Sequence, residues 1–497
     1  MVKKSNKFDF YGKLTFTVII IGIIIRFGLA SIYSVSGDAC WQFSAARFLA
    51  ENKRFPLYEN LGRIEPFWAP HLFHVIAASL YLLFGVFGAN AAEFGMKMIA
   101  PFFGSLTLIF VYLLNKKFFN EEITFYSMLF TTFIPIFMDY GIISYIDSTL
   151  TFFIILSIYF AIDDKYIKSS IAAGLAVMTK YNGIFILPLL IYINYKNSAN
   201  YKVLFKKLFL LILIIFLIGF PWLLRNYIEF SNPFWPFFNF LSKGPVKSEL
   251  VAADSLTFKT INPLNIFSFN SISFTYLAFF GVPEGNYKNL FFFDIPYLKI
   301  LLILWLLGTL FFLIPFVKGF RIDDKTKSRI LLIWILSYAI VVLLYISNVR
   351  WNATRFFLPA VPALGMLYGN GLSRIDFKNK NLKILFFVVI SLIITGFVIA
   401  EAVKISLASK AWSFYKEDFA WIKANTPKDA LIIPGIQCMA YYLNRGIFEG
   451  TIENIKKADY VLVNPNFKLE RPAIIGEELL KVVKENKYEK VYENNKT

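Results

Sequence analysis

The stretch Leu208–Leu224, LFLLILIIFLIGFPWLL, decides the fold class because it is an apolar run without a single charged side chain. An α-helix of about 20 such residues crosses the roughly 30 Å of hydrocarbon in a bilayer. Comparable runs recur along the chain, for example Ile300–Val317. The sequence therefore predicts an all-α, polytopic membrane protein.

Composition supports this class. The 497 residues are 57% hydrophobic and 19% aromatic, with a mean hydropathy of +0.58, more apolar surface than a soluble core of this size can hide. The net charge of +18 comes from short basic clusters between apolar runs, so a nucleic-acid partner is not expected. The first run, Thr15–Tyr33, is too long for a signal peptide and is expected to be a retained helix.

The positive-inside rule orients the chain with its N-terminus in the cytoplasm. Six inner segments then hold most of the lysines and arginines between the spans, whereas four short outer turns hold only Lys180, Arg350 and Arg355. The eleven expected spans are 14–34, 94–114, 123–140, 145–162, 167–179, 183–195, 207–224, 297–317, 330–347, 356–371 and 383–402. The short pair 167–179 and 183–195 is expected to be broken or tilted helices that meet at Lys180.

This topology requires that the apolar segment His71–Phe87 does not cross the membrane, so an interfacial or re-entrant helix is expected there. Residues 1–404 then form a transmembrane domain with outer loops at 35–93 and 225–296. Residues 405–497 form a small extracytoplasmic α/β domain, in which helices alternate with buried strands such as Ala430–Pro434.

Only two cysteines are present, Cys40 and Cys438, which excludes a disulfide framework and metal-type cysteine spacing. Both lie outside in this topology. A single bridge between them is therefore one of the alternatives that the sequence leaves open.

Ionisable side chains gather at the outer ends of the expected helices. In a chain this apolar such residues need an explanation, because charge is costly near hydrocarbon. Acids and bases on one membrane surface suit an anionic substrate that is attacked with the help of a carboxylate base. The residues concerned are Asp38, Glu65, Asp147, Lys180, Arg225 and Arg355.

The motifs around these residues resemble those of the GT-C superfamily of membrane glycosyltransferases, in the branch of protein O-mannosyltransferases and lipid A aminoarabinose transferases. The similar segments, in the same order, are Asp38 after the first span, Glu65-Pro66 with Pro70–His74, Asp147–Phe153, Gly174–Tyr181, Pro221–Tyr227 with Ser231–Pro236, and Arg355–Pro362. Ala39 follows Asp38, where the mannosyltransferase branch has adjacent acids, and Pro66 follows Glu65, where the aminoarabinose branch has a lysine. Neither branch's substrate is therefore carried over.

The resemblance implies a glycosyltransferase that takes a sugar from a polyprenyl or dolichyl phosphate at the outer membrane face. The acceptor is a hydroxyl of a protein, glycan or lipid, and the reaction is one displacement with inversion. The implied roles are a general base for Asp38, acceptor binding for Glu65, Asp147 and His74, and phosphate binding for Lys180, Arg225 and Arg355.

The sequence also allows other roles for these residues. A divalent metal ion could bind at Asp38, Glu65 and His71, although packing is the commoner role of such histidines. The carboxylates could be salt-bridged helix-end residues, and the cations could be interfacial anchors. The alternative function is a transporter or flippase of lipid-linked sugars, but transporters usually have two related halves, which this chain lacks.

Overall fold

The computed structural model describes residues 2–57, 67–238, 313–348, 351–376, 379–411, 416–433, 437–444, 446–447 and 458–462, with short pieces at 481, 484–485 and 488–493. Among them, four helical stretches are long and apolar enough to cross a bilayer, which makes the chain a multi-pass membrane protein. These stretches are Phe10–Ile32, Ala89–Phe118, Tyr201–Phe230 and Asn381–Leu407.

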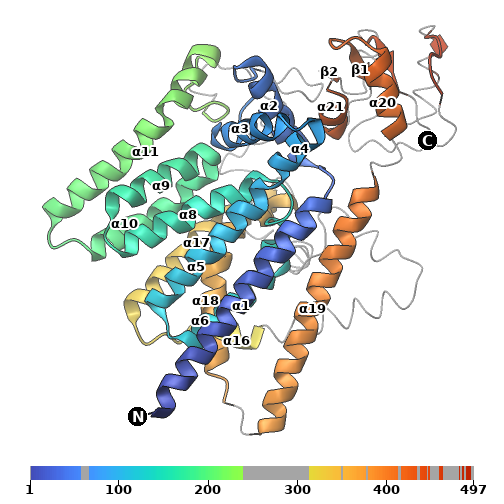
Figure 1. The fold of residues 1–497 in the computed structure, drawn as a ribbon. Helices are drawn as coiled ribbons and strands as arrows, with labels where there is room; N and C mark the ends of the chain where they lie inside the picture. The colour runs from blue at the N-terminus through green and yellow to red at the C-terminus, as the bar shows by residue number, and fades with distance from the viewer. Residues whose placement is uncertain are drawn as a thin grey trace.

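The four stretches differ in how much of their surface faces the surroundings. The helices α11 (Tyr201–Phe230) and α19 (Lys380–Ala411) lie at opposite edges of the bundle (Figure 1), and only 22% and 17% of their apolar windows are buried. The window formed by α4 (Ala89–Lys97) and α5 (Ile99–Phe118) is 61% buried. The apolar surfaces of α11 and α19 therefore suit contact with lipid chains, while α5 belongs to the core.

Further helices, most of them shorter, lie next to α1 (Val2–Ile32) and α5. Their bounds are α6 (Glu121–Phe133), α7 (Pro135–Asp139), α8 (Ile146–Ile162), α9 (Tyr166–Thr179), η1 (Tyr181–Ile186), α10 (Leu187–Lys196), α16 (Leu313–Gly319), α17 (Lys325–Asn348), η3 (Trp351–Ala360) and α18 (Val361–Ser373). These helices coincide with most of the remaining expected spans. Several of them are too short or too broken to count as membrane spans by length alone. The total of eleven spans therefore stays a prediction, and most of the expected span 297–317 lies outside the described residues.

The break that the sequence placed at Lys180 is present. Lys180 has an extended backbone between the end of α9 and the start of the 3₁₀-helix η1. Gly183 then approaches the backbone of Ala176 and Val177 so closely that no side chain would fit. This close approach turns the chain back on α9 and leaves Lys180 at the turn.

Helices α2 (Asp38–Asn52) and α3 (Leu72–Gly85) lie with α4 at the end of the bundle where α1 finishes, opposite the N-terminus (Figure 1). Helix α3 has 14 residues, or about 21 Å at 1.5 Å per residue, which is shorter than the hydrocarbon thickness. Its length agrees with the expected non-spanning helix at residues 71–87.

The C-terminal residues lie at this same end of the molecule (Figure 1) and contain α20 (Lys416–Asn425), β1 (Leu431–Ile433), α21 (Gln437–Leu443), β2 (Gly446–Ile447) and β3 (Tyr460–Val461). The strands form a parallel sheet in the order β2-β1-β3, in which Ile432 pairs with Ile447 and Tyr460. A small core of Phe419, Ile422, Ile432 and Leu443 joins helices and sheet. We call α20, α21 and the three strands the C-terminal unit. Its predicted start at residue 405 falls inside α19, which continues to Ala411, and the domain boundary stays a prediction.

Candidate active site

Asp38 and Arg355 form an ion pair between segments that are 317 residues apart in the sequence. Asp38 is the first residue of α2, directly after Gly37 with its positive φ of 58°, and Arg355 comes from η3. The Nη1 atom of Arg355 donates to Oδ2 of Asp38 at 2.5 Å. The side chain of Asp38 is 38% exposed, so a ligand can reach the carboxylate.

Asp147 and Lys180 form a second, deeper ion pair. Asp147 lies in the first turn of α8, and Nζ of Lys180 is 2.7 Å from its Oδ1 atom. The two side chains are only 2% and 8% exposed, so each charge depends on the other for compensation.

Aromatic side chains join the two pairs into one cluster. The Phe356 ring lies 4.4 Å from Nζ of Lys180 and 5.6 Å from Cζ of Arg355. Arg355 also packs over the ring of Tyr145, whose hydroxyl accepts a hydrogen bond from the backbone N–H of Asp38 at 3.2 Å. Lys180 interacts electrostatically with both Arg355 and Asp38. Four of the residues singled out in the sequence therefore share one site, which we call the four-charge cluster.

Arg225 has different neighbours. Its guanidinium donates to the backbone oxygens of Phe67 at 3.2 Å and Pro56 at 3.1 Å, and lies 4.8 Å from the ring of Trp222. These contacts tie α11 to the segments that flank residues 58–66. The structure thus gives Arg225 an anchoring role, and its predicted contact with phosphate stays a prediction.

The two histidines lie in an aromatic cluster beside Arg225. The His71 ring stacks on Phe55 at 3.6 Å and meets Trp222 edge-on at 4.1 Å. His74 is 1% exposed, and its Nε2 atom shares a hydrogen bond of 2.5 Å with the amide oxygen of Gln42. Burial lowers the pKa of both rings, that of His74 to about 3, so both are neutral. His74 is thus packed in the interior and engaged by Gln42, and its predicted contact with the acceptor stays a prediction.

Glu65, the second predicted acid, lies outside the described residues, and so does most of the outer loop at 225–296. Within the described part of the chain, no group of three or more His, Cys, Asp or Glu side chains is placed to hold a metal ion. The suggested metal ligands Asp38, Glu65 and His71 include Glu65 and therefore stay a prediction.

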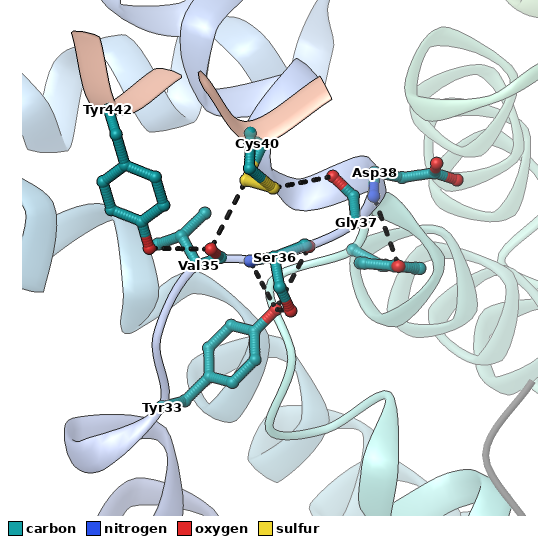
Figure 2. Close-up of a disulfide and its surroundings, with 9 residues drawn as sticks. Tyr33, Val35, Ser36, Gly37, Asp38, Cys40 and Tyr442 are labelled. Carbon is teal, nitrogen blue, oxygen red and sulfur yellow. Dashed lines mark hydrogen bonds between the residues drawn. A yellow bond between two sulfur atoms is a disulfide. The ribbon is translucent and has the colours of Figure 1, made fainter. Parts of the chain in front are cut away.

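The two cysteines form a disulfide, an alternative that the sequence had left open. Cys40 in α2 and Cys438 in α21 have Cα atoms 5.0 Å apart, although 398 residues separate them in the sequence. Figure 2 shows the bridge beside the turn Val35–Asp38, where the hydroxyl of Tyr442 donates to the Val35 carbonyl at 2.7 Å. The C-terminal unit is therefore bonded to the segment that carries Asp38.

The apolar helices and the charged cluster at one end of the bundle define a class, the polytopic membrane proteins. Residues 69–224, which include Asp147 and Lys180, match the family described as dolichyl-phosphate-mannose-protein mannosyltransferase. No curated protein sequence matches the chain.

Three solved structures share the fold over most of this chain. ArnT from Cupriavidus metallidurans bound to undecaprenyl phosphate is 14% identical with a TM-score of 0.56, over 94% of this chain and 87% of that chain. The Archaeoglobus fulgidus oligosaccharyltransferase is 13% identical with a TM-score of 0.59, over 95% and 68%. The mycobacterial arabinofuranosyltransferase AftD is 10% identical with a TM-score of 0.52, over 88% and 32%.

The resemblance to the GT-C superfamily of membrane glycosyltransferases that the motifs indicated is confirmed.

Proposed function

We propose that this protein transfers a sugar from a polyprenyl or dolichyl phosphate to an acceptor hydroxyl at the outer face of the membrane. The observation that carries the proposal is the four-charge cluster, in which the pairs Asp38–Arg355 and Asp147–Lys180 meet at one end of the bundle. The cluster supplies both a reachable carboxylate and two cations, the groups that such a transfer needs.

The cations suit a lipid phosphate. ArnT was crystallised with undecaprenyl phosphate, and an archaeal relative, AglB, with a dolichol phosphate. In this chain the lipid tail would lie along the apolar helices while the phosphate rests against Arg355 and Lys180. Arginine can hold two phosphate oxygens with its planar fork, and lysine acts as a point charge.

The proposed reaction is a single displacement. The acceptor oxygen attacks the anomeric carbon, its proton passes to the Asp38 carboxylate, and the bond between the anomeric carbon and the phosphate oxygen breaks. The electron pair of that bond stays on the phosphate, which gains a negative charge as it leaves. Arg355 and Lys180 would stabilise this developing charge, and the sugar inverts its configuration.

The ion pair of Asp38 also suggests an order of events. In the structure the guanidinium of Arg355 donates a hydrogen bond to one carboxylate oxygen of Asp38. A donor phosphate at Arg355 would compete with that carboxylate and free it to accept the acceptor's proton. Asp147 would keep Lys180 charged in its buried position until the phosphate arrives.

The disulfide supports the proposed side of the membrane. Disulfides form and persist in oxidising compartments, and both bridged cysteines must face the same one. The bridge joins α2 to the C-terminal unit, both of which the basic residues in the inner loops predict to be outside. The proposed location is therefore the cell membrane, with a cytoplasmic N-terminus and the cluster facing outward.

The test uses full-length protein in proteoliposomes with a labelled donor, first dolichyl-phosphate mannose and then undecaprenyl-phosphate aminoarabinose. A membrane extract from the source cells supplies acceptors. The proposal expects labelled sugar on an acceptor with release of the polyprenyl or dolichyl phosphate, and little transfer by Asp38→Asn. Equal transfer by Asp38→Asn would exclude Asp38 as the base. Movement of labelled donor across the bilayer without transfer would instead support the flippase alternative.

A further inference from the structure

The disulfide and Tyr442 surround the short turn that carries Asp38. Cys40 lies in the first turn of α2, two residues after Asp38, and its partner Cys438 lies in α21. The bridged sulfurs have no hydrogen to donate, yet they contact the carbonyl oxygens of Val35 at 3.4 Å and Gly37 at 3.9 Å. Figure 2 shows that Tyr442 reaches the same turn from the C-terminal unit.

The turn is held from the membrane domain as well. The hydroxyl of Tyr33 accepts from the N–H of Ser36 at 3.0 Å, and the hydroxyl of Tyr145 accepts from the N–H of Asp38 at 3.2 Å. Gly37 packs directly against the Tyr145 hydroxyl, so the turn lies between Tyr145 and the disulfide.

From these contacts we infer that the Cys40–Cys438 bridge, together with Tyr442, positions Asp38 for proton transfer, so that the C-terminal unit is a working part of the active site. The inference rests on the proposed function, in which Asp38 is the base. Neither cysteine touches the reacting atoms in this account. They act as positioning residues through the backbone of Val35, Gly37 and Asp38.

The four charged groups differ in which part of the protein holds them. Asp147 and Arg355 come from α8 and η3, and Lys180 from the break between α9 and η1, all in the membrane domain. Asp38 alone begins a helix that is covalently tied to the C-terminal unit. Opening the bridge should therefore disturb the base while leaving the phosphate-binding cations in place. A shift of about 1 Å in a catalytic group can lower the rate as much as a hundredfold.

The experiment compares oxidised and reduced full-length protein in nanodiscs. Dithiothreitol reduces the Cys40–Cys438 bridge. It transfers two electrons and two protons to the two sulfurs, which become thiols, and is itself oxidised to its cyclic disulfide. We expect reduction, or the double substitution Cys40→Ala/Cys438→Ala, to lower kcat about tenfold to a hundredfold with an unchanged KM for the donor. The double variant should not respond further to dithiothreitol, which controls for effects of the reductant elsewhere.

Two tyrosines of the C-terminal region provide a matched pair of variants. Tyr442→Phe removes the hydroxyl that bonds to Val35, and we expect kcat to fall at constant KM. Tyr492→Phe makes the same chemical change at a hydroxyl that donates to Asp418 of α20, away from the turn, and should keep wild-type kcat. Equal effects of the two substitutions would overturn the inference.

A second readout does not depend on activity. Hydrogen–deuterium exchange should increase in the turn Val35–Cys40 after reduction, while the peptides that contain Asp147 and Lys180 keep their protection. Unchanged kcat in the double variant overturns the positioning role, and so does a parallel loss of kcat and donor binding. If the wild-type protein transfers no sugar, the proposed function is wrong. The exchange measurement then tests the positioning role alone, and unchanged exchange in the turn would overturn that role.

Discussion

Replacing Lys180 by Met should destabilise the protein strongly, because the substitution leaves a buried carboxylate without its counter-charge. The side chains of Lys180 and Asp147 are 8% and 2% exposed and lie 2.7 Å apart. Breaking such a pair by removing one partner typically costs about 3–5 kcal/mol. We therefore expect Lys180→Met to lower the free energy of unfolding by about 4 kcal/mol.

The opposite end of α8 offers a matched control. There Lys117 pairs with Asp163, but these side chains are 22% and 28% exposed. Solvent screens this pair, so Lys117→Met should cost less than about 1 kcal/mol. Equilibrium unfolding with increasing SDS in mixed micelles, followed by tryptophan fluorescence, measures both variants on the same scale.

A double substitution separates stability from binding. Lys180→Met/Asp147→Leu replaces the buried pair with apolar side chains, which is often neutral for stability. It should recover most of the lost stability but should not recover binding of undecaprenyl phosphate in nanodiscs. The reasoning is refuted if Lys180→Met costs no more than Lys117→Met, or if the double variant binds the lipid phosphate as the wild type does.

Four further outcomes are expected. Asp38→Asn should lower kcat by about 10²–10⁴ with little change in donor KM, measured by the release of lipid phosphate. Arg355→Gln should weaken binding of undecaprenyl phosphate at least tenfold, and Arg355→Lys should restore it only in part, because lysine lacks the planar fork. Gly37→Ala should cost more than the about 1–2 kcal/mol of its positive φ, because a Cβ there would also clash with the Tyr145 hydroxyl, measured by SDS unfolding. Because burial lowers the pKa of His74 to about 3, the unfolded state binds the extra proton and stability falls below about pH 6.5. Between pH 7 and pH 5.5 the loss from His74 should be about 1 kcal/mol, and His74→Gln should remove this share while the share of His71, whose pKa burial also lowers, remains.

The part of the site that the sequence predicts best is its position at one end of the helix bundle. The positive-inside rule predicts which helix ends share one face, and the charged residues at those ends are few. The sequence predicts six such residues together, Asp38, Glu65, Asp147, Lys180, Arg225 and Arg355. The structure joins four of them by the ion pairs Asp38–Arg355 and Asp147–Lys180. Which acid pairs with which base could not be predicted, because it depends on how α2, α8, α9 and η3 pack.

Long-range contacts are the part that local patterns do not predict. The guanidinium of Arg225 bonds to backbone oxygens of Phe67 and Pro56 from a distant part of the chain, and its predicted phosphate contact stays a prediction. The sequence predicts no partner for Arg26 in the first span. In the structure this side chain is fully buried and donates to the carbonyl of Thr132 near the end of α6. Only the packing of α1 on α6 reveals that partner.

The disulfide, like the contacts of Arg225 and Arg26, could not be predicted from the sequence alone. Two cysteines on one side of the membrane allow a bridge, but bridging requires Cα atoms within about 7 Å, and no sequence pattern gives that distance. The fold of the C-terminal unit brings Cys438 to 5.0 Å from Cys40. The link between this unit and Asp38 is therefore a property of the tertiary structure.

A structure of the full-length protein with bound undecaprenyl phosphate would test the proposed roles of the four-charge cluster. We expect the phosphate to lie within hydrogen-bonding distance of Arg355 and Lys180, and the carboxylate of Asp38 to have left Arg355 and to face the position of the sugar. A phosphate bound away from these two cations, or an intact Asp38–Arg355 pair beside a bound phosphate, would contradict these roles.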